Sequence, residues 1–201
     1  MDPQLSDSLL HVIASELEEE GSKALGYNEL TAHSLNNFVA SYAKYKKKCD
    51  PKVLNTLVSN LYHRKTMQRQ QDDGTSKQEV VMRKIPPKWI CESLWAFGLT
   101  GIKPTKENFT FIKDSISDRI DDFNARDLVM TLYSLYRIES KFFKDSQKLK
   151  VINVGKTVKL LVMKIELKKG RVDKVQKDMM QEMNWWTKKF YDRGCMSIFE
   201  N

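Results

Sequence analysis

Glycine and proline are scarce in this chain of 201 residues, which contains 8 Gly and 5 Pro. An all-β sandwich or barrel normally needs more turn residues than this, so helix is the favoured class. No segment sustains the period-two alternation of a half-buried strand. The one candidate strand, Val80 to Met82, is too short to build a sheet. The sequence therefore predicts an all-α protein.

Signatures of catalytic, metal-binding and membrane proteins are also missing. Cys49, Cys91 and Cys195 have no close spacing, which argues against a disulfide framework or a zinc site and favours a reducing compartment. The three histidines lack metal or triad spacing, and no glycine-rich phosphate loop is present. No apolar run approaches the roughly 20 residues needed to span a bilayer. We expect no catalytic residue, metal, cofactor, small-molecule substrate or membrane span.

Positive charge is abundant, and it is distributed unevenly. The net charge is +8, but residues 1–40 sum to −6, so residues 41–201 sum to +14. The basic side chains cluster, which favours an anionic partner such as RNA, although lysine-rich helices can simply be well solvated. The candidate RNA-binding residues are Lys44, Lys46, Lys47, Lys48, Arg64, Lys65, Arg69, Arg137, Lys156, Lys159, Lys164, Lys168, Lys169 and Arg171.

Apolar residues at helical spacing, together with start and stop signals, predict the helices. We expect helices at about 7–20, 31–47, 51–61, 87–99, 106–120 and 124–138. Two or three more are expected between 146 and 197, with breaks at Gly155, Gly170 and Gly194. Asn124 is expected to cap one helix start, and a helix is expected to end near Gly101. Residues 65–84 form a predicted polar loop.

The predicted helices contain an internal repeat. The same kinds of side chain recur in three first helices, at Leu35, Ile90 and Leu128, at Val39, Leu94 and Leu132, at Ser41, Ala96 and Ser134, and at Tyr42, Phe97 and Leu135. The interval from the first copy to the second is longer than that from the second to the third. In the helices that follow, the same long interval separates Leu54, Leu57 and Leu61 from the apolar residues Phe109, Ile112 and Ile116. This pattern predicts an α-solenoid of stacked antiparallel helix pairs, with a repeat of about 38 residues and an insertion in one copy.

Residues 30–140 resemble a known class of repeat. The stretch from Trp89 to Glu139 contains SLWAFGLTGIKP and FIKDSISDRIDDFNARDLVMTLYSLYRIE. It is similar to the octotricopeptide and heptatricopeptide repeats, which also occur in FAST-kinase-like and RAP-domain proteins. The first copy departs from the pattern, because Ala40 stands where the second copy has Trp95. No C-terminal RAP domain is evident, which weakens any expectation of nuclease activity.

This resemblance implies organelle RNA metabolism. We expect a mitochondrial matrix protein that binds rRNA or organelle mRNA, alongside other proteins of a large assembly such as the mitochondrial ribosome or an RNA-processing complex. No transit peptide is evident, and a cytoplasmic location is the alternative. The competing hypothesis is a protein–protein adaptor or supernumerary subunit without RNA contact. Residues 1–145 are expected to form the repeat array, and residues 146–201 a basic helical extension or cap.

Four aromatic residues carry more specific hypotheses. Trp95 and Tyr133 stand off the predicted core stripes, where they could stack on unpaired bases. Packing between repeats is the alternative, and it is the commoner use of large aromatics at helical spacing. Trp185 and Trp186 could be a docking anchor for a partner protein, or the apolar face of a terminal capping helix. The sequence leaves both choices open.

Overall fold

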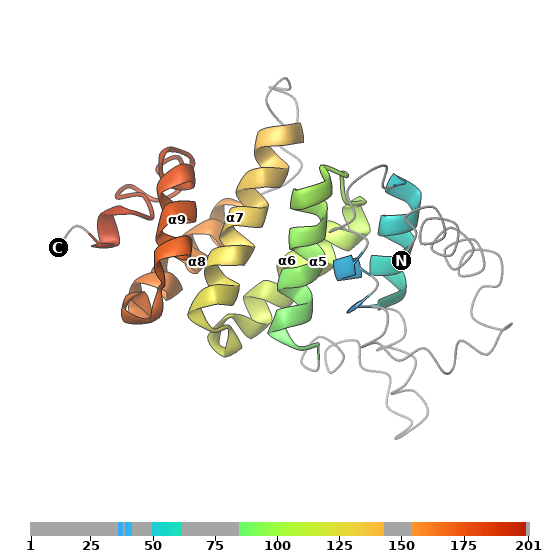
Figure 1. Ribbon diagram of the computed structural model, residues 1–201, viewed down its shortest axis with the longest axis horizontal. Helices are drawn as coiled ribbons and strands as arrows, with labels where there is room; N and C mark the ends of the chain where they lie inside the picture. The colour runs from blue at the N-terminus through green and yellow to red at the C-terminus, as the bar shows by residue number, and fades with distance from the viewer. Residues whose placement is uncertain (1–35, 38, 42–49, 62–84, 143–153, 200–201) are drawn as a thin grey trace, which may run out of the picture.

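The computed structural model describes residues 36–37, 39–41, 50–61, 85–142 and 154–199 (Figure 1). Helices joined by turns account for the regular structure of these residues, and no strand occurs among them, so the all-α prediction is confirmed. A helix at 51–61 is followed by α5 (Pro87–Thr100), α6 (Lys106–Arg119), the 3-10 turn η2 (Ile120–Asp122), α7 (Ala125–Phe142), α8 (Gly155–Leu167), η3 (Lys169–Arg171), α9 (Lys174–Thr187) and η4 (Ser197–Phe199).

Local signals in the sequence explain where these helices begin and end. Helix α5 has Pro87 in its first turn and ends at Gly101, whose φ of 73° lies in the left-handed region that glycine tolerates best. The side chain of Thr105 accepts a hydrogen bond from the Asn108 backbone amide and caps α6. The side chain of Asn124 does the same for the Asp127 amide at 2.8 Å. The predicted end near Gly101 and cap at Asn124 are therefore confirmed.

The helices pack in a regular order of neighbours. Helix α7 packs against α5 on one side and α9 on the other, while α6 contacts α5 and α8, and α8 contacts α7. Along the long axis of the molecule the chain advances from the helix at 51–61 through α5 and α7 to α9 (Figure 1). The predicted boundary at residue 145 falls between α7 and α8, which are packed on each other.

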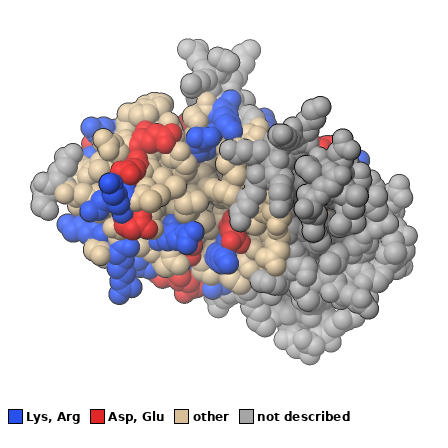
Figure 2. Space-filling model, in the orientation of Figure 1, with Lys and Arg blue, Asp and Glu red and all other residues tan. Residues whose placement is uncertain are grey.

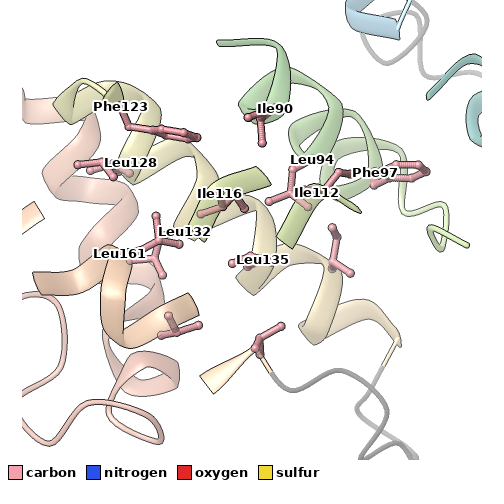
Figure 3. Packing of buried hydrophobic residues seen from close by; sticks show 14 of the residues in the cluster. Ile90, Leu94, Phe97, Ile112, Ile116, Phe123, Leu128, Leu132, Leu135 and Leu161 are labelled. Atoms are coloured by element: carbon pink, nitrogen blue, oxygen red, sulfur yellow. The ribbon is translucent and has the colours of Figure 1, made fainter. Parts of the chain in front are cut away.

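One hydrophobic core runs through all these helices (Figure 3). Ile90 and Leu94 of α5, Leu132 of α7 and Leu161 of α8 are fully buried in it. Burial of one such side chain contributes about 1.5–3 kcal/mol, and no helix could gain this alone. The described positions of the predicted apolar columns are buried, namely Val39, Ile90, Leu94, Phe97, Leu128, Leu132, Leu135, Leu54, Leu57, Leu61, Phe109, Ile112 and Ile116.

The predicted column of small residues is only partly buried. Ala96 and Ser134 are buried in the core, Ser134 against Gly98 of α5, whereas Ser41 is exposed. A small side chain promotes close approach only where another helix covers it, and none covers Ser41 in the described structure. Leu35 and Tyr42, the two other first-copy positions, lie outside the described residues.

A buried polar contact holds the helix at 51–61 against α6. Asn108 is 3% exposed, and its amide donates to the Asn55 carbonyl oxygen at 3.0 Å and to Asn55 Oδ1 at 3.1 Å. Its own oxygen accepts from the Ser59 hydroxyl at 2.8 Å. Because a buried amide must find partners, these bonds select one register between the two helices.

Residues 188–199 fold back over α9. The Cys195 amide donates to the Thr187 hydroxyl at 3.0 Å, and the Met196 amide donates to Asn184 Oδ1 at 3.1 Å. Ile198 is 3% exposed and belongs to the core. This segment covers apolar surface of α9 that would otherwise face water at the C-terminal end of the described helices.

Candidate nucleic-acid interface

Positive charge is concentrated in the C-terminal part of the described structure. Residues 85–142 carry 8 basic and 8 acidic side chains, whereas residues 154–199 carry 11 basic and 5 acidic ones, a net charge of +6. Figure 2 shows blue basic groups, with red acidic groups between them, over the end of the molecule where α9 lies. The basic excess predicted from the sequence therefore belongs, within the described residues, to α8, α9 and the segments beside them.

Three of the candidate basic residues are exposed and unpaired. Lys156 and Lys159 lie on the solvent-facing side of α8, and Arg171 lies in η3 before α9. None of the three forms an ion pair with another residue of the described structure. A cation without an internal partner loses no ion pair or hydrogen bond of the fold when it binds a phosphate. These three side chains are therefore the best placed for phosphate contacts.

Three other candidates already hold the fold together. The Lys164 ammonium group pairs with Asp121 and keeps the pKa of that carboxyl below its usual value. The Lys168 ammonium group donates to the Phe123 carbonyl oxygen, and that of Lys169 donates to the Ile198 carbonyl oxygen at 3.5 Å. These lysines would have to give up internal contacts to bind RNA, and a structural role explains them better.

The remaining basic candidates divide into two groups. Arg137 is half-buried on α7, with its guanidinium carbon 5.9 Å from the centre of the Tyr133 ring. Seven others lie outside the described residues, namely Lys44, Lys46, Lys47, Lys48, Arg64, Lys65 and Arg69.

Tyr133 joins α7 to α9 and does not stand free. Its hydroxyl donates to Glu182 Oε2 at 2.7 Å, and partial burial together with this carboxylate raises the pKa of the phenol. Trp95 is half-buried and packs against the core, as Tyr133 also does. Both side chains are partly covered by the core, which favours the packing alternative for them, and the base-stacking hypothesis stays a prediction.

The two adjacent tryptophans occupy opposite environments. Trp186 is 1% exposed, its indole N–H donates to Glu139, and its ring contacts Tyr136 and Phe190. The prediction that Trp186 anchors a partner protein is therefore wrong, because its side chain is part of the core. Trp185 is 56% exposed and remains on the surface.

Sequence reasoning overlooked the exposed apolar residues of α8. Met163 is 52% and Leu167 77% exposed, and they share the outer face of the helix with Lys156 and Lys159. The signal was present in the sequence. Two helical turns separate Lys156 from Met163 and about one more leads to Leu167, which places all three on one face of a helix.

The described residues bear on two chemical features, metal-ligating clusters and reactive thiols. They contain no group of three His, Cys, Asp or Glu side chains that could hold a metal ion. Burial raises the pKa of the Cys91 thiol to about 12, and burial also raises the pKa of Cys195. Neither thiol is therefore an activated nucleophile near neutral pH. None of the described helices combines the length and the apolar character that crossing a membrane requires.

Comparison with known proteins did not assign the chain to a family. No protein-family model, curated protein or solved structure matched it. The candidate site residues are therefore defined by their own exposure: Lys156, Lys159 and Arg171 as cations without an ion pair in the described structure, and Trp185 as an exposed aromatic on α9.

Proposed function

We propose that this chain is an α-solenoid of antiparallel helix pairs that binds RNA within a mitochondrial ribonucleoprotein. The helix starts support the repeat, because the interval from Pro87 of α5 to Ala125 of α7 equals the one predicted from the apolar columns. The interval from Ala125 to Lys174 of α9 is longer. The extra length has two sources. Helix α7 has 18 residues whereas α5 has 14, and the connection between α7 and α8 is longer than the one between α5 and α6. The packing of α7 between α5 and α9 is the neighbour order that such an array requires.

The observation that carries RNA binding is the charge of residues 154–199. This segment contains eleven basic and five acidic side chains. Lys156, Lys159 and Arg171 are exposed, and none of them forms an ion pair within the described structure. Lysine and arginine bind phosphates without reading sequence, and each contact releases counterions. Such a surface suits a structural component of a ribonucleoprotein better than a reader of bases.

The resemblance to octotricopeptide and heptatricopeptide repeats supports the place of action. It favours the mitochondrial matrix and rRNA or organelle mRNA as the partner, in the mitochondrial ribosome or an RNA-processing complex. The balanced charge of residues 85–142 supports the rest of this proposal, because a neutral surface suits contacts with other proteins of the assembly.

One observation favours a second candidate, a protein adaptor without RNA contact. Met163 and Leu167 are large apolar side chains left in water on α8, at 52% and 77% exposure. Exposed apolar residues beside lysines fit an acidic, amphipathic partner helix as well as they fit an RNA-bound surface. The two candidates therefore differ in whether the lysines of α8 meet phosphates or carboxylates.

Filter binding of single-stranded RNA across a salt series tests the proposal. We expect binding at low salt that falls steeply as salt rises. The triple variant Lys156→Glu, Lys159→Glu and Arg171→Glu should lose roughly tenfold or more in affinity and show a smaller salt slope. The matched control is the triple variant Lys103→Glu, Lys106→Glu and Lys113→Glu. These lysines lie in the charge-balanced part of the chain, and their substitution changes the net charge by the same amount.

Two results would contradict RNA binding through this surface. One is no binding of RNA at about 50 mM salt, in which case recovery of the chain with protein partners alone would favour the adaptor. The other is an equal loss of affinity in both triple variants, because the net charge of the chain would then matter more than the α8 surface.

A further inference from the structure

Trp185 lies at a defined position in the row of neighbouring helices. One constant shift along the chain carries the buried residues Leu128, Leu132, Leu135 and Ile138 of α7 onto Gln176, Met180, Met183 and Trp186 of α9, which are buried too. The same shift carries Arg137 onto Trp185. Arg137 and Trp185 therefore occupy equivalent places on adjacent helices, beside the core and toward solvent.

The indole of Trp185 is supported from within the molecule. The Tyr136 ring meets it at a right angle, with an interplanar angle of 85° and a centroid distance of 6.2 Å. Tyr136 in turn contacts the buried Trp186 ring at 5.8 Å. Because these contacts attach Trp185 to the core, the exposed part of the indole is presented in a preferred orientation.

One positive group lies over this aromatic ring. The Lys189 ammonium nitrogen lies 4.8 Å from the centre of the Trp185 ring, and Lys188 is exposed next to it in the chain. Arg137, at the equivalent place on α7, is half-buried and already engaged, with its guanidinium over the Tyr133 ring and 3.5 Å from the Tyr133 hydroxyl. The nearest carboxylate on α9 is Glu182, which already accepts the hydrogen bond of Tyr133.

An exposed aromatic ring flanked by cations is the arrangement that binds an unpaired nucleotide. The ring stacks on the base, and the cations meet the phosphates on either side. An apolar protein anchor would not need the Lys189 cation at its ring, so the charge favours a polyanion.

We propose that Trp185 is a stacking site for one unpaired base of single-stranded RNA, with Lys189 binding an adjacent phosphate. The proposal rests on the proposed function, since it names the part of the RNA that the C-terminal surface contacts. It also moves the base-binding position from Trp95 and Tyr133, which are half-buried against the core, to the exposed aromatic of α9.

The test compares two probes on the full chain by fluorescence anisotropy. One is a labelled oligomer of eight uridines, and the other is an abasic sugar–phosphate oligomer of the same length. Wild type should bind the base-bearing oligomer about tenfold more tightly. Trp185→Ala should reduce this ratio to near one while the salt slope stays the same, and Trp185→Phe should keep most of the ratio.

Val175→Ala is the matched control. Val175 is 63% exposed on the same helix and has no place in the proposed site, so its variant should keep the wild-type ratio. If wild type binds RNA but Trp185→Ala has the same ratio, or if wild type binds both oligomers equally, the stacking site is refuted and RNA binding by charge still stands. If neither oligomer binds wild type at low salt, the proposed function itself fails.

Discussion

Gly98 of α5 lies directly against the backbone of Ser134 in α7. A β-carbon added at Gly98 would meet the Ser134 carbonyl oxygen at 3.2 Å and its α-carbon at 3.3 Å. Ser134 is itself small and 1% exposed. The two residues let α5 and α7 approach closely, and this approach buries the apolar side chains on either side of it.

Gly98→Ala is therefore expected to destabilise the protein. Replacing glycine by alanine in a helix interior normally raises the free energy of unfolding by about 1 kcal/mol. Here the new methyl group presses on backbone atoms that cannot rotate away, and overpacking of this kind costs about 1–3 kcal/mol. We expect a lower urea midpoint for Gly98→Ala and a larger loss for Gly98→Val. Gly170→Ala, where no atom lies within 4 Å of the new β-carbon, should change little. A raised midpoint for Gly98→Ala would contradict the close contact.

Asn108 should be more important for stability than a surface asparagine. Asn108→Ala leaves the Asn55 carbonyl and the Ser59 hydroxyl without this partner, and a lost buried hydrogen-bond partner costs about 1–3 kcal/mol. The comparison is Asn60→Ala, because the Asn60 amide donates only to the Thr56 carbonyl of its own helix, at 3.0 Å. Chemical denaturation measures both. Equal losses in the two variants would show that the contact between the helix at 51–61 and α6 does not depend on Asn108.

The two adjacent tryptophans should respond differently to truncation. Trp186→Ala removes a ring from the core and leaves Glu139 without its indole partner, so we expect a loss of about 3–5 kcal/mol. Trp185→Ala removes an exposed ring and should cost less than about 1 kcal/mol. Thermal unfolding followed by circular dichroism compares the two. A stability loss for Trp185→Ala as large as that for Trp186→Ala would refute the assignment of Trp186 to the core and Trp185 to the surface.

The buried thiols should be unreactive in the folded protein. Burial raises the pKa of Cys91 from 9.0 to about 12 and also raises that of Cys195, so the reactive thiolate is nearly absent at pH 8. In a Cys49→Ser background we expect little modification by iodoacetamide at pH 8, and modification of both thiols once urea unfolds the chain. Mass spectrometry of the labelled peptides reads out each site. Labelling of Cys91 at the rate of a free thiol in native protein would contradict its burial.

The same thiols determine the direction of a pH effect on stability. Their pKa values are higher in the folded than in the unfolded chain, so the unfolded chain releases these protons first as pH rises. The stability contribution is constant below pH 9 and falls between pH 9 and about 12. Cys91→Ala should make the unfolding midpoint less sensitive to pH in this range.

Local sequence signals were sufficient to predict the helices between residues 51 and 142, whereas the helix predicted at about 7–20 and most of the one at 31–47 lie outside the described residues. Pro87, Gly101, Thr105 and Asn124 act through their own backbone preferences and through hydrogen bonds to residues up to four positions away. The apolar columns were also predictable, because helical periodicity states which side chains must be hidden together. Ser41 was the exception, since its exposure depends on whether a second helix covers it.

The candidate site depended on information that no local pattern contains. Lys156, Lys159, Lys164 and Lys168 look equivalent along the sequence, yet Lys164 meets Asp121 and Lys168 meets the Phe123 carbonyl, partners that lie far away in the chain. Long-range partners decide which cations are used internally and which remain free. The sequence gives the number of positive charges, but it does not show which of them have partners inside the fold.

Trp185 and Trp186 separate the properties that the sequence predicts from those that depend on tertiary packing. Composition and periodicity determined that the chain is helical, that its apolar stripes repeat and that its C-terminal part is basic. One residue along a helix is a rotation of about 100°, so two adjacent tryptophans must point in different directions. Which of them is buried was decided only when α7 packed on one side of α9 and residues 188–199 folded over another, because burial is a property of what covers a side chain.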